Sequence, residues 1–195
     1  AGLAIGAAVV YKKFFSLEAR IKKAEEATEN AKVAADGAKE AYDELSSGIT
    51  ELKDAQNKLS GLTTGTLEFK QALLEVNQQV LNLQKKFPQL LGKAKFDDAT
   101  GAMYFLEEDL DNALEEQMKA VNRANNAYSV AQLNEQQLKT QQTTLSKTTD
   151  IGLYRGNQSS STDDEEKQKY QVKINQAKAE IQAQKNTQEA LSRQF

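Results

Sequence analysis

A heptad repeat runs without a break from Val10 to Leu59. Counted in alternating steps of four and three, its positions are Val10, Phe14, Leu17, Ile21, Ala24, Thr28, Ala31, Ala35, Ala38, Tyr42, Leu45, Ile49, Leu52, Gln56 and Leu59. An average spacing of 3.5 residues keeps one stripe of a helix against a partner helix. The repeat therefore predicts a helix of about 50 residues, roughly 75 Å long at 1.5 Å per residue, packed against another helix.

Three further helices follow from the spacing of apolar residues. We expect the four helices near 10–60, 67–87, 100–147 and 163–195, with Pro88, the only proline, ending the second. The second helix has the most hydrophobic stripe, which Leu74, Leu81 and Leu91 are expected to widen. Four helices, two of them about 50 residues long, predict an all-α fold: an elongated antiparallel helical bundle or coiled coil.

Composition divides this bundle into four segments. These are an apolar N-terminal segment (1–15), the long-helix bundle (16–147), a flexible linker (148–162) and a C-terminal helix (163–195). The linker is predicted because its Ser, Gly, Asn and Gln residues bury too little apolar area to offset the cost of ordering. Thr162 and Glu165 have capping-box spacing at the start of the last helix.

Two runs of alanine are expected to pack against each other. The first run is Ala24, Ala31, Ala35 and Ala38, and the second is Ala120, Ala124, Ala127 and Ala131. Small side chains allow two helices to lie close together. The predicted helix-packing seam is thus an intramolecular antiparallel contact, which leaves self-assembly to the apolar N-terminal end.

The N-terminal segment is the predicted contact with a membrane or a protein partner. Its contact residues are Leu3, Ile5, Val9, Val10, Tyr11, Lys12, Lys13, Phe14 and Phe15. Eleven uncharged residues are about half of the ~20 that span a bilayer. The two lysines and the aromatic residues are typical of an interface with lipid.

Residue types exclude most chemistry. The chain has no His and no Cys, which removes thiol catalysis, His-based acid–base chemistry and the usual zinc sites. The acidic cluster from Glu107 to Glu116 lacks both the histidines of di-iron proteins and a calcium-binding loop, so we interpret it as a solvated face. With a net charge of −3, the chain shows no general attraction to nucleic acid. We therefore expect no enzymatic activity, cofactor, metal, nucleic acid or small-molecule substrate.

The apolar residues 1–10, the flanking Lys12 and Lys13, and the long helix that follows resemble the long-helix α-pore-forming toxins of the cytolysin A and haemolysin BL kind. That resemblance implies a soluble subunit that assembles on membranes. The departure is that the hydrophobic segment here precedes the long helices instead of lying between two of them. A virion protein inserted into a host envelope has a similar N-terminal pattern.

Two functional interpretations remain open at this point. The first is a non-enzymatic structural or interaction protein, which assembles through helix faces and docks by its apolar N-terminal end to protein partners or a membrane. The second is a membrane-active subunit of the pore-forming or virion kind. A membrane-associated or secreted location is favoured over a cytoplasmic one.

Overall fold

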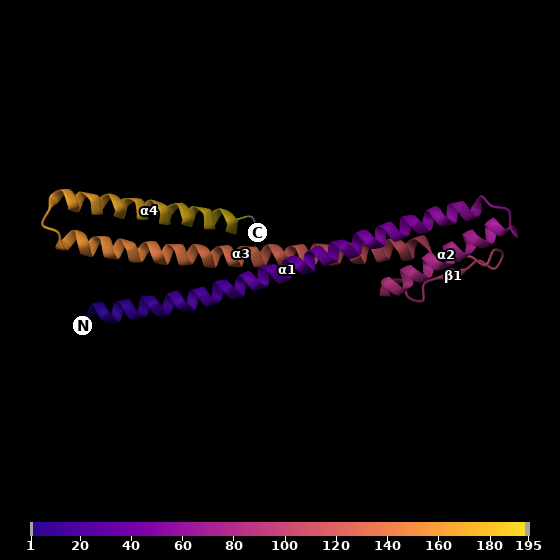
Figure 1. Ribbon diagram of the computed structural model, residues 1–195, viewed down its shortest axis with the longest axis horizontal. Helices are drawn as coiled ribbons and strands as arrows, with labels where there is room; N and C mark the ends of the chain where they lie inside the picture. Colours follow the sequence, from indigo (N-terminus) through magenta and orange to yellow (C-terminus); the bar gives the residue numbers. More distant parts are fainter. Residues whose placement is uncertain (1, 194–195) are drawn as a thin grey trace. The chain divides into compact units, whose positions relative to one another are not determined.

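The computed structural model describes residues 2–193, with side chains described from Phe14 to Ala190 and at Arg193. Over this range the chain is an all-α helical bundle of four helices: α1 (Gly2–Ser60), α2 (Leu67–Lys86), α3 (Glu107–Ser160) and α4 (Asp164–Ser192) (Figure 1). A 3₁₀ turn (Pro88–Leu90) follows α2, and a short hairpin of β1 (Lys95–Phe96) and β2 (Met103–Tyr104) precedes α3. The predicted all-α class is confirmed.

The helix boundaries correct two of the expectations. The third helix begins at Glu107 and not near residue 100, because the hairpin occupies the preceding residues. It also continues to Ser160, so the segment 148–162, expected to be a flexible linker, is helical up to that residue.

The polar groups of this helical segment have hydrogen-bond partners on α3 itself and on the neighbouring helix α4. Thr148 donates to the carbonyl oxygen of Thr144 at 2.7 Å, four residues earlier, and Thr149 donates to Leu145 at 3.0 Å. From α4, the carbonyl oxygen of Lys167 accepts from the Gln158 amide at 3.1 Å. Polar groups that suggest a loop are here satisfied inside a helical hairpin.

The chain divides into two compact units, each containing parts of α1 and α3. The terminal unit comprises residues up to Ala31 together with those from Ala127 onward, and the central unit is Lys32–Asn126.

The central unit holds the largest apolar cluster among the described residues. Its buried members are Leu45, Ile49, Leu52, Ala55, Leu59, Phe69, Ala72, Val76, Val80, Leu83, Phe87, Leu90, Phe105, Leu110 and Ala113. These residues come from α1, α2, the 3₁₀ turn, the segment before α3 and the first two turns of α3. The heptad positions of α1 and one apolar stripe of α2 thus meet in this cluster, and Phe87 caps α2 just before Pro88.

A glycine sets the approach of α1 to α2. A Cβ atom at Gly48 would lie 2.7 Å from Cδ2 of Leu83, a side chain that is only 4% exposed. Ion pairs flank this contact on the same two helices, with Lys58 3.0 Å from Glu75 and Lys86 3.2 Å from Glu44.

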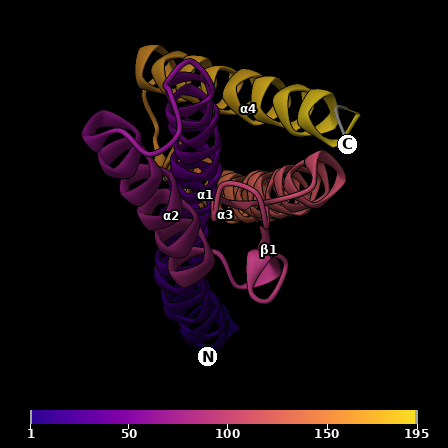
Figure 2. The same ribbon diagram turned by 90° about the vertical axis from the view of Figure 1, so that its right-hand side faces the viewer.

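Hydrogen bonds with Asn77 fix the hairpin to the side of α2; Figure 1 shows β1 alongside α2, and Figure 2 shows the same region end-on. The Asn77 side chain accepts from the Met103 backbone N–H at 2.7 Å and donates to the carbonyl oxygen of Gly101 at 3.3 Å. In the hairpin loop, Asp97 accepts from the Thr100 hydroxyl at 2.7 Å and from the Ala99 N–H at 3.0 Å. These two hydrogen bonds lower the pKa of the Asp97 carboxyl.

In the terminal unit, α1 packs against α3 in the antiparallel sense. Leu17, Ile21 and Ala24 form a buried cluster with Leu138, against which Leu145 packs. Close beside it, Lys139 of α3 lies 2.8 Å from the carboxylate of Glu25. This cluster is much smaller than that of the central unit.

Mainly polar contacts join α3 to α4. Lys147 lies 2.6 Å from Glu180, and the rings of Tyr154 and Tyr170 stack with centroids 6.4 Å apart. On the α4 side only Ile174 and Ala177 are fully buried among the described residues.

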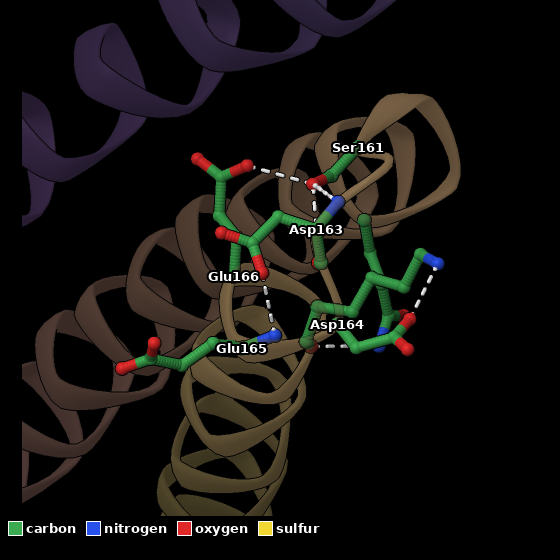
Figure 3. Close-up of polar contacts among 7 residues, drawn as sticks. Ser161, Asp163, Asp164, Glu165 and Glu166 are labelled. Atoms are coloured by element: carbon green, nitrogen blue, oxygen red, sulfur yellow. Dashed lines mark hydrogen bonds and ion pairs between the residues drawn. The ribbon is translucent and has the colours of Figure 1, made fainter.

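At the connection between α3 and α4, Asp163 caps the N-terminus of α4 (Figure 3). Its Oδ1 accepts from the Glu165 N–H at 2.9 Å, while the Ser161 hydroxyl donates to Glu166 at 2.7 Å and accepts from the Asp163 N–H at 3.2 Å. The capping-box expectation for Thr162 and Glu165 is therefore wrong by one residue, since α4 starts at Asp164.

We predict opposite outcomes for alanine at two glycines of α1. Gly37→Ala should raise the melting temperature, because nothing lies within 4 Å of the added Cβ and alanine stabilises a helix by about 1 kcal/mol relative to glycine. Gly48→Ala should lose this gain and destabilise the protein, because forcing a methyl group into a packed core costs roughly 1–3 kcal/mol. Thermal unfolding followed by circular dichroism measures both, and equal stabilisation would contradict the close approach at Gly48.

We also predict that Asp163→Ala lowers the stability of the terminal unit by about 1 kcal/mol, the usual cost of losing a helix N-cap. Thr162→Ala is the matched control and should have little effect. Hydrogen exchange at the first amides of α4 measures the local loss. Greater sensitivity at Thr162 would restore the original capping prediction.

Candidate interaction surfaces

The predicted N-terminal contact lies mostly outside the described side chains. The backbone of its residues belongs to α1, but the side chains of Leu3, Ile5, Val9, Val10, Tyr11, Lys12 and Lys13 lie outside the described residues. Phe14 is partly buried and Phe15 is 68% exposed. Among the described residues, no helix carries an apolar stretch long enough to cross a membrane.

The alanine seam is covered unevenly. In the terminal unit Ala24 is buried, Ala31 and Ala131 are partly buried, and Ala127 is exposed. The next residue of α3, Tyr128, is partly buried, whereas Ala127 is exposed.

In the central unit, Ala35 is buried at 5% exposure, whereas Ala38, Ala120 and Ala124 are partly buried. The packing of the two alanine runs against each other thus stays a prediction.

An ion-pair network links α1 to α3 inside the terminal unit. Lys139 lies 2.6 Å from Glu135 on its own helix and 2.8 Å from Glu25 on α1. Hydrogen bonds to these two carboxylates raise the pKa of Lys139 from 10.5 to about 12. The same ammonium group is the main cause that lowers the pKa of Glu135 below its usual 4.5.

We predict that Lys139→Gln destabilises the terminal unit near neutral pH more than the matched change Lys119→Gln. The Lys119–Glu115 pair joins two residues of one helix, whereas Lys139 also bridges two helices. Because the pKa of Glu135 is lowered in the fold, its stabilisation is present above 4.5 and disappears as the pH falls through its lowered pKa. The free energy of unfolding should therefore fall less on acidification in Lys139→Gln than in the parent protein.

Melting temperatures of the parent and both variants, measured from acid to neutral pH, check this prediction. On the alkaline side, the raised pKa means that the stabilisation by Lys139 is complete below 10.5 and disappears as the pH rises through about 12. Identical curves for the two variants would mean that the bridge to Glu25 contributes nothing.

Ion pairs with lysines neutralise part of the negative charge of the acidic cluster at the start of α3. Lys93 lies 3.2 Å from Asp109, Lys119 lies 2.6 Å from Glu115, and Lys53 lies 3.8 Å from Glu107. Within the part of the chain that could be searched, no group of three acidic side chains is arranged to hold a metal ion. The first-turn acids also lie at the helix N-terminus, where negative charge is favourable.

A surface that the sequence analysis missed lies on α2. Leu74 and Leu81 were expected to widen the buried stripe, but they are 70% and 48% exposed, and Leu67 is 67% exposed. We call these three residues the outer leucine face. Leu91, also expected in the stripe, is 70% exposed beyond the end of α2.

The sequence does contain the signal for this face. The three leucines are spaced by seven residues, and at 100° per residue they project on the side of α2 opposite to Phe69, Val76 and Leu83. The expectation of one wide buried stripe is wrong, because α2 has two separate apolar stripes and only one of them is buried.

Comparisons with protein-family models, with curated proteins and with solved structures gave no match. The proposals below therefore depend on the residues and contacts of this chain alone.

Proposed function

We propose that this chain is a non-enzymatic helical interaction protein that docks and assembles through apolar helix surfaces. One observation carries the proposal: the stretch from α2 to the start of α3 leaves large apolar side chains exposed. They are Leu67, Leu74, Leu81, Leu91, Phe96 and Leu106, exposed by 39–70%. Three of them, Leu67, Leu74 and Leu81, share one side of α2, and apolar side chains exposed together in this way mark surfaces that bind another molecule.

The N-terminal segment supplies a second docking end in this proposal. Phe15 is 68% exposed, and it directly follows the apolar and lysine-flanked residues at the start of α1. In this first function, the N-terminal end binds a protein partner or a second copy of the chain.

The second candidate function is a membrane-active subunit, of the α-pore-forming-toxin-like or virion kind. The observation that favours it is that the apolar residues 3–10 continue directly into the long helix α1. An apolar helix end flanked by lysines and aromatic residues suits the lipid interface.

Liposome flotation of the full chain and of a variant lacking residues 1–15 separates the two functions. A membrane-active subunit floats with vesicles, and the truncation abolishes flotation because it removes the apolar end. A protein-docking chain stays in the unbound fraction with or without these residues. Circular dichroism of both forms verifies that the truncated chain keeps its helices.

Analytical ultracentrifugation of the same samples tests the broader proposal. We expect self-association that grows with concentration, or binding to vesicles, or both. A chain that stays monomeric up to its solubility limit and binds no vesicles would overturn the proposed function.

A further inference from the structure

The outer leucine face lies on a helix that is anchored on its other sides. Toward α1, Glu75 accepts from Lys58 at 3.0 Å, and toward the hairpin, Asn77 bonds both Gly101 and Met103. Between these two flanks, Leu67 and Leu74 remain more than two-thirds exposed. Neither α1 nor the hairpin covers the leucines.

We infer that the outer leucine face binds the same face of a second copy of this chain, as a parallel two-stranded coiled coil. This inference rests on the self-assembly part of the proposed function and names its partner. A spacing of seven residues brings the leucines to successive d positions, and Gln71 and Gln78, both exposed, take the a positions between them. A lipid surface places no such requirement on the spacing.

The charges beside the face favour the parallel arrangement. Lys70 takes a g position and Glu75 the following e position, and both are exposed. In a parallel pair, each Lys70 lies next to Glu75 of the other copy, which gives two ion pairs related by symmetry. An antiparallel pair centred on Leu74 brings the two Glu75 carboxylates together instead.

Polar residues limit the strength of this pairing. The face extends over only two heptad steps, from Leu67 to Leu81, of a 20-residue helix, and the glutamines at a positions contribute less than apolar side chains would. At the next a position, Lys85 meets Lys85 of the second copy, and Pro88 ends the repeat. We therefore expect a weak dimer that dissociates on dilution, not a permanent one.

Sedimentation equilibrium with a matched pair of variants tests the face. Leu74→Glu should weaken the dimer roughly tenfold or more, since it replaces a central apolar contact by two like charges. It should leave the fold intact because Leu74 is 70% exposed. Leu153→Glu, at a leucine of α3 that is 61% exposed, is the control and should leave the dimer unchanged.

A charge exchange tests the ion pair. Lys70→Glu alone and Glu75→Lys alone should each weaken the dimer, and the double exchange should restore part of the affinity. The Lys58–Glu75 contact is lost in both variants that carry Glu75→Lys, so the comparison between these two isolates the contact between copies.

Single cysteines report the direction of pairing. The chain has no cysteine, so Leu67→Cys and Leu81→Cys each introduce a unique thiol. In a parallel dimer each variant forms a disulfide with itself on mild oxidation, and a mixture of the two adds little. An antiparallel dimer forms the disulfide only in the mixture, which would overturn the parallel arrangement.

The remaining outcomes also decide between the proposals. A dimer that survives Leu74→Glu would overturn the inference and leave the proposed function standing. A monomer that binds vesicles through its leucines would likewise overturn the inference and leave the proposed function standing. A monomer that binds no vesicles would overturn both.

Discussion

The contact between α1 and α2 is the interaction on which the central unit depends. Among the described residues, the largest fully buried side chains include Leu45 and Leu52 of α1, Val76 and Val80 of α2, and Leu90 just beyond it. They can interlock because Gly48 allows Leu83 to lie against the backbone of α1. A dense apolar cluster of this kind provides most of the hydrophobic stabilisation available to the unit.

The terminal unit is stabilised differently. Its buried cluster consists of a few residues around Leu138, and much of the contact between helices comes from ion pairs, amide groups and the stacked tyrosines. Exposed ion pairs contribute little each, about 0–1 kcal/mol. We therefore expect this unit to open locally at lower cost than the central one, as small apolar contacts generally allow.

Apolar residues that the fold does not bury link this architecture to function. Helix α2 has one apolar stripe in the central cluster and a second one, the outer leucine face, directed away from it. For a helix with two apolar faces, the hydrophobic free energy is gained in full only when both faces are removed from water. Our proposals follow from that imbalance, because the described part of the chain covers only one of the two faces.

The sequence by itself determined the all-α class and the approximate extents of α1 and α2. The 3.5-residue repeat is a local property of the chain, so it predicted α1 and α2 and the class of the fold, and Pro88 predicted the end of α2. Tertiary structure decided what the repeat cannot encode. Residues 148–160 are helical in spite of their polar composition, and Gln158 among them donates to the Lys167 carbonyl oxygen of α4. The hairpin before α3 is held to α2 by Asn77. Contact with α1 likewise decided which stripe of α2 is buried. Both stripes have helical periodicity, so only packing distinguishes them.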